Sequence, residues 1–195
     1  MLVAPEFIAY ASRQVVRKLH PVWAECSNIE SAATQVAKVI EDDLRAEDKL
    51  NEEVRAILEQ YEAVMQKEGA SYMEMFRRIK RKLVTERKLV LASGREAGDR
   101  VKLSRDKILD LSHKVITELK RSRDVRIRKD PNDVRLEIVK QLTEIFQLEE
   151  RIDAAAREKV RSLKRGVQEG VDEWEVLHRR YYAEELKRFG IDLAK

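Results

Sequence analysis

Apolar residues recur every three or four positions along most of the chain, which is the spacing of one buried helix face. The predicted helices span about residues 4–19, 27–68, 71–91, 104–119, 131–163 and 171–189. The segment Val125–Ile127 alternates between apolar and basic residues, but it is too short to predict a strand. The pattern therefore predicts an all-α protein.

One of these helices has an interrupted apolar face. Its apolar positions stop at Leu44 and resume at Leu50, and four of the five residues between them are charged. Two interpretations fit this gap: a bend or break near Glu47–Leu50, or a single long rod with one solvated stretch. The missing apolar turn favours the break.

The apolar register of the first half returns in the second half without a gap. Each of ten apolar or aromatic positions has an apolar or aromatic counterpart 102 residues later, and Ser12, Val15 and Leu19 return 100 residues later. A register held through several helices predicts two related helical units of about four helices each, elongated and pseudo-symmetric. Their predicted limits are 1–92 and 101–195, with a glycine-containing joint at 93–100. The ten first-half positions are Val36, Ile40, Leu44, Leu50, Leu58, Tyr61, Met65, Tyr72, Met75 and Ile79.

Composition supports long, solvated helices. Charged residues make up 39% of the chain, which has only six glycines and three prolines. The abundance of Glu, Lys and Arg matches the bias of proteins from hyperthermophiles. The single cysteine, Cys26, excludes an intrachain disulfide and indicates a reducing, cytoplasmic setting. We expect no signal peptide, membrane span or membrane partner, because no stretch is long and apolar enough.

Catalytic motifs are not recognisable. Glu175 and His178 have the spacing of a di-iron helix, but such a site needs a second Glu-x-x-His, and the first half offers only Glu74 followed three residues later by Arg77. We therefore interpret Glu175 and His178 as part of a surface helix. With no phosphate-binding loop or nucleophile motif, the sequence predicts neither an enzyme nor a cofactor or metal.

A run of basic residues between two predicted helices stands out from the otherwise balanced charges of the chain. It could bind a polyanion such as nucleic acid, or it could be a solvated part of a Lys- and Arg-rich surface. The equivalent first-half segment is almost uncharged, so the fold does not require these cations. A second cluster lies in the predicted helix 71–91, from Arg77 to Lys88. The candidate polyanion-binding residues are Lys120, Arg121, Arg123, Arg126, Arg128 and Lys129.

A set of short motifs runs through the second half, namely Leu103-Ser104, Ser162-Leu163, Val167, Glu169-Gly170, Trp174-Glu175, Leu177, Tyr181-Tyr182 and Glu184-Glu185. In these motifs the second half resembles a bacterial family known as domain of unknown function 507. The resemblance covers residues 103–190 strongly. It implies a diverged copy in residues 1–92, where Glu68-Gly69 is retained but Tyr72 replaces the tryptophan and Ile79-Lys80 replaces the tyrosine pair.

The resemblance implies no substrate, cofactor or reaction. We interpret the positions in its last helix as structural or docking residues, namely Trp174, Glu175, Tyr181, Tyr182, Glu184 and Glu185. The sequence is best interpreted as a non-enzymatic scaffold or interaction protein with an unidentified protein partner and an open oligomeric state. The alternative is a nucleic-acid-binding protein that uses the basic loop 120–129.

Overall fold

Helices dominate the structure, a computed structural model that describes residues 3–61, 65, 67, 69–92, 103–163 and 171–191. This confirms the predicted all-α class. The joint at 93–100 and the motif residues Glu68, Val167, Glu169 and Gly170 lie outside the described residues. The elements are α1 (Pro5–Leu19), β1 (Ala24–Cys26), α2 (Ile29–Gln60), α4 (Tyr72–Arg87), α5 (Arg105–Arg121), β2 (Val125–Ile127), α6 (Pro131–Arg161) and α7 (Asp172–Arg188).

A short two-stranded ribbon is the exception to the helical pattern. Strand β1 pairs antiparallel with β2, so that Ala24 lies opposite Ile127 and Cys26 opposite Val125. The amide of Arg128 donates to the carbonyl of Trp23 at 3.0 Å and extends the pairing. The prediction of no strand at 125–127 was therefore wrong, because its partner strand lies about a hundred residues away and no local pattern reveals it.

Helix α2 runs unbroken from Ile29 to Gln60, so the predicted break near Glu47–Leu50 is also wrong. Leu44 and Leu50 are both buried, and Glu47 lies between them, three residues from each and so on the same helix face. The Glu47 carboxylate accepts from Lys80 Nζ at 3.1 Å and from the Ala92 amide at 2.8 Å. The helix therefore continues through the gap in the apolar pattern, because the glutamate on its buried face has polar partners.

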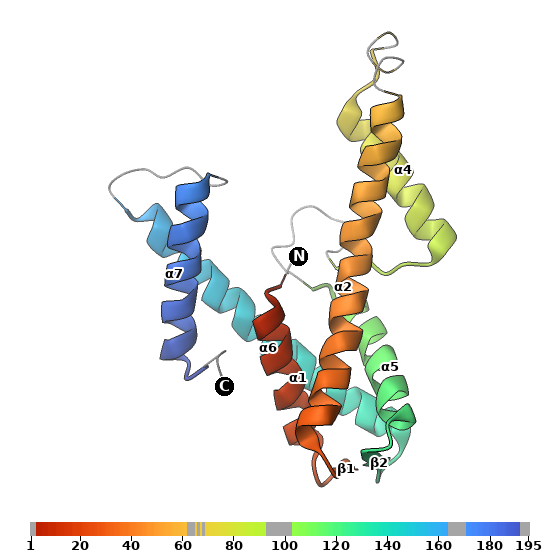
Figure 1. Ribbon diagram of the computed structural model, residues 1–195, viewed down its shortest axis with the longest axis vertical. Helices are drawn as coiled ribbons and strands as arrows, with labels where there is room; N and C mark the ends of the chain where they lie inside the picture. The colour runs from red at the N-terminus through yellow and green to blue at the C-terminus, as the bar shows by residue number, and fades with distance from the viewer. Residues whose placement is uncertain are drawn as a thin grey trace. The chain divides into compact units, whose positions relative to one another are not determined.

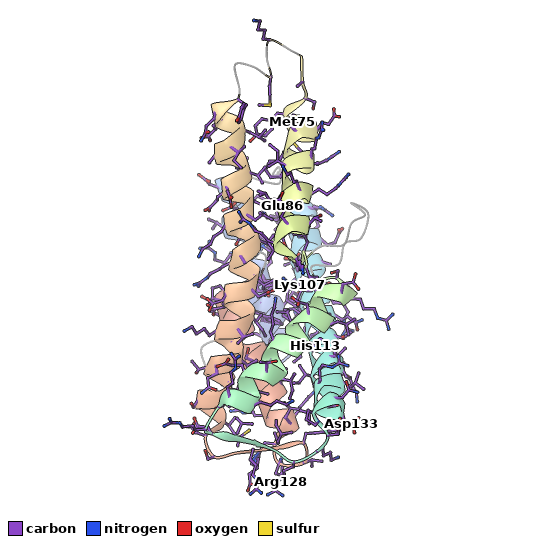
Figure 2. All side chains as sticks on the ribbon, turned by 90° about the vertical axis from the view of Figure 1, so that its right-hand side faces the viewer. Met75, Glu86, Lys107, His113, Arg128 and Asp133 are labelled. Carbon is purple, nitrogen blue, oxygen red and sulfur yellow. The ribbon has the colours of Figure 1, made fainter. Side chains whose placement is uncertain are left out.

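The chain divides into two compact bodies, an N-terminal body (Met1–Val139) and a C-terminal body (Lys140–Lys195). In the N-terminal body, helices α1, α4 and α5 all contact α2 (Figure 1). Helix α4 runs antiparallel beside the end of α2 (Figure 2). Its half-buried Phe76 and Ile79 pack on a buried cluster that includes Val54 and Leu58.

The C-terminal body contains the end of α6 and helix α7, which form a second helical hairpin (Figure 1). Ile152, Ala156 and Val160 of α6 are fully buried, as is most of Trp174 in α7. Among the helices of the described residues, none combines the length and apolarity needed to cross a membrane.

Candidate functional site

Two motif residues of α7, Trp174 and Tyr182, contact α6 and belong to a polar and aromatic cluster in the C-terminal body. The indole of Trp174 is 7% exposed, and it stacks on the His178 ring at 4.8 Å with an interplanar angle of 6°. The guanidinium of Arg157 lies 5.3 Å above the same indole. His178 Nε2 is 3.0 Å from Asp153 Oδ1, and Asp153 Oδ2 accepts from Arg157 Nε at 2.7 Å. These four side chains form a closed ring of contacts between the two helices.

A buried glutamate extends the cluster by one helical turn. Glu149 is 1% exposed and lies between Phe146 and Ile152 on the apolar face of α6. The Tyr182 hydroxyl donates to Glu149 Oε1 at 3.0 Å. Burying a carboxylate is costly unless hydrogen bonds replace its water, so Tyr182 offsets part of that cost.

A third set of contacts closes the hairpin near the end of α7. Lys159 Nζ lies 2.6 Å from a carboxylate oxygen of buried Glu185, and Arg188 donates to that carboxylate at 3.0 Å. The hydrogen bond from Lys159 holds the pKa of the Glu185 carboxyl below its ordinary value. Lys159 Nζ also lies 5.5 Å from the centre of the Tyr181 ring.

These contacts give most motif positions a structural partner. Trp174 and Glu185 are buried, Tyr181 and Tyr182 are half-buried, and of these α7 positions Glu175 alone is exposed. Glu184, also partly exposed, accepts from Arg180 at 3.2 Å. Because His178 turns toward Asp153 while Glu175 is exposed, the two do not form a ligand pair; within the described ranges no three metal-ligating side chains gather.

Much of the basic run 120–129 lies in regular secondary structure, although the sequence predicts a loop there. Lys120 and Arg121 belong to the last turn of α5, and Arg126 lies within β2. Arg128 forms an ion pair with Glu25 at 2.7 Å across the ribbon, and its hydrogen bond lowers the pKa of the Glu25 carboxyl. Lys129 Nζ lies 4.0 Å above the Trp23 ring. Two of the six candidate cations therefore have partners that the sequence did not indicate.

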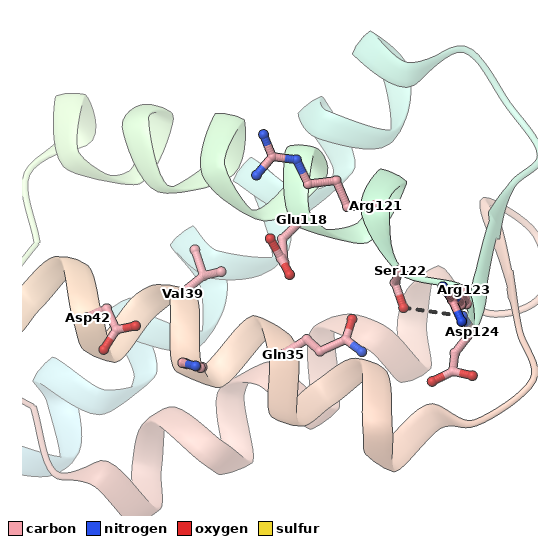
Figure 3. Close-up of a pocket in the computed structure, with 9 residues that line it drawn as sticks. Gln35, Val39, Asp42, Glu118, Arg121, Ser122, Arg123 and Asp124 are labelled. Atoms are coloured by element: carbon pink, nitrogen blue, oxygen red, sulfur yellow. Dashed lines mark hydrogen bonds between the residues drawn. The ribbon is translucent and has the colours of Figure 1, made fainter.

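The other four candidates, Lys120, Arg121, Arg123 and Arg126, are exposed and form no ion pair within the part of the chain that the structure describes. A groove of about 660 Å³ lies between α2 and the end of α5 (Figure 3). Three cations and three carboxylates line this groove, so its charges balance and it is poorly suited to a phosphate group. They are Lys38, Arg121, Arg123, Asp42, Glu118 and Asp124.

A buried ion pair in the N-terminal body went unnoticed in the sequence. Lys107 is 2% exposed, donates to the carbonyl of Val90 at 2.7 Å and forms an ion pair with Asp43. Lys114 binds the same carboxylate and also Asp110, at 2.6 Å. Lys107 occupies a position where the apolar face of α5 would otherwise continue. A lysine at such a position is the feature of the sequence that could have indicated a buried ion pair.

Comparison of the sequence with known protein families shows which family the chain belongs to. No curated protein matches the chain. The family model described as "Protein of unknown function (DUF507)" matches residues 1–191. This match extends beyond residues 103–190, where the resemblance is strong in the sequence, and includes the first half. The chain therefore belongs to the DUF507 family.

Proposed function

We propose that this chain is a non-enzymatic helical scaffold that acts by binding a protein partner. The observation that carries the proposal is that three side chains of α7 already have partners within the α6–α7 hairpin. Trp174 and Tyr182 of the family motif, together with His178, contact α6 or one another. Side chains that stack on one another and bind a neighbouring carboxylate stabilise the fold. The function is then left to the outward-facing surfaces of the helices.

We also propose that the two halves are copies of one unit, with limits 1–92 and 101–195. Contacts at the same 102-residue offset support this. Lys80 binds Glu47 at 3.1 Å as Tyr182 binds Glu149 at 3.0 Å. The Tyr72 ring likewise stacks on Phe76 as Trp174 stacks on His178. In both hairpins a ring pair and a contact to a glutamate lie at matching positions, although the side chains differ.

Capture of partners from native lysate tests the scaffold proposal. The full chain is immobilised, and bound material is compared with and without nuclease and at low and high salt. A scaffold retains a defined protein after nuclease treatment and at high salt, because apolar contacts are not screened. Retention that disappears with either treatment would contradict the proposal and indicate nucleic acid instead.

A second candidate function is nucleic-acid binding through residues 120–129. The observation that favours it is the exposure of Lys120, Arg121, Arg123 and Arg126, none of which forms an ion pair in the residues described. The balanced charges of the neighbouring groove weigh against it, since its carboxylates repel phosphates. We therefore rank this function second.

Replacing Arg121, Arg123 and Arg126 with Ser should leave the melting temperature nearly unchanged, because exposed charges contribute little to stability individually. If residues 120–129 bind nucleic acid, the same variant should lose low-salt binding of duplex DNA in a gel shift. A large drop in the melting temperature would show that these arginines are structural.

A further inference from the structure

Helix α4 has two faces of different chemistry. Met75, Phe76, Ile79 and Leu83 are partly buried and pack toward α2. The opposite face is exposed and bears only polar or charged residues from Arg77 onward. Its cations are Arg77, Arg78, Arg81, Lys82 and Lys88.

Neighbouring carboxylates neutralise only some of the cations near this face. Lys80 pairs with Glu47, and Arg87 forms a two-bond pair with Glu53. Lys82 lies 3.9 Å from Glu86. The remaining cations of the face form no ion pair among the residues that the structure describes. These are Arg77, Arg78, Arg81 and Lys88.

Helix α7 shows that a hairpin of this kind does not require such a face. Helix α4 contains six Lys or Arg residues and two Glu, whereas α7 contains four Lys or Arg and five acidic residues. In α7, Arg180 pairs with Glu184 and Arg188 with Glu185. Because α7 keeps its charges nearly balanced, a hairpin of this kind forms without the excess of cations that α4 has.

We infer that the outer face of α4 binds the sugar-phosphate backbone of duplex nucleic acid, without sequence specificity. Protein interfaces need an apolar or aromatic centre, and stable membrane binding needs apolar side chains that insert. From Arg77 to Lys88 the exposed face offers neither. Three of its four unpaired cations are arginines, whose planar fork suits phosphate oxygens. This inference goes beyond the proposed scaffold function and assigns a surface separate from residues 120–129.

The dimensions suit a backbone contact. Residues 77 to 87 rise about 15 Å along the helix axis. That length of duplex carries roughly nine phosphate charges, which is more than the face has cations. Four contacts predict that the logarithm of the affinity falls with the logarithm of the salt concentration with a slope of about −3.6.

The test uses the full chain and a fluorescent duplex of random sequence, with anisotropy read between about 50 and 200 mM salt. One variant changes Arg77, Arg78 and Arg81 to Gln, which keeps helix propensity nearly constant. Its matched control changes Arg179, Arg180 and Lys187 of α7 to Gln. A third protein carries R121S, R123S and R126S, which separates this inference from the second candidate function.

The α4 variant should fold as the wild type does by circular dichroism, bind more weakly and have a slope shallower by about 2.7. The control should bind nearly as the wild type, and R77K/R78K/R81K should keep the wild-type slope because its charge is unchanged. Three results would overturn the inference: no wild-type binding at low salt, an unchanged slope in the α4 variant, or an equal loss in the α7 control. Binding to anionic vesicles without binding to the duplex would also overturn it.

Discussion

Trp174→Ala should lower the free energy of unfolding by roughly 3–5 kcal/mol, the usual cost of removing a buried tryptophan. The indole is 7% exposed and supports both the His178 ring and the Arg157 guanidinium. Its loss leaves a cavity between α6 and the first turn of α7. Urea titration followed by far-ultraviolet circular dichroism measures the effect without relying on the lost fluorophore.

The matched control is Tyr72→Ala, an aromatic residue 102 positions earlier in the sequence. Tyr72 is 44% exposed, so its removal should cost much less than that of Trp174. A loss below about 1 kcal/mol for Trp174→Ala would mark the indole as a docking group rather than a core residue.

Asp43→Ala should destabilise the N-terminal body by roughly 3–5 kcal/mol, because it leaves the ammonium of Lys107 buried without its carboxylate. The Lys107 side chain is 3% exposed, whereas the Lys114 side chain is 42% exposed and can stay hydrated. The effect is measured by urea titration.

The double variant D43L/K107M tests whether the two charges act as a pair. Replacing both by apolar residues of similar size is often neutral or stabilising, so the double variant should be more stable than Asp43→Ala. If the double variant is as unstable as the single one, the cost comes from lost packing at Asp43 rather than from an uncompensated charge.

Burial was largely predictable from the sequence because helical periodicity is a local property. The apolar positions from Val36 to Leu58 are buried at the predicted spacing, and Val134, Ile138 and Leu142 are fully buried. Trp174, for which the sequence left a structural and a docking role open, is also buried. For such residues the pattern alone determines which face is covered.

Polar residues on the apolar faces were not predictable in the same way. Glu47 and Glu149 each interrupt an apolar stripe, and both are tolerated because a side chain from the following helix binds them. The partner of Lys107 lies on another helix, 64 positions earlier in the sequence. A local pattern records the interruption but does not reveal the distant group that satisfies it.

Trp174 and Tyr182 of the family motif should hold α6 and α7 together rather than form an exposed binding site. Tyr182→Phe distinguishes these two roles, because the change removes only the hydroxyl that donates to Glu149. The free energy of unfolding should fall by about 1–3 kcal/mol, the cost of removing a hydrogen bond from a buried carboxylate. An unfolding free energy equal to that of the wild type would show that Tyr182 does not hold the two helices together.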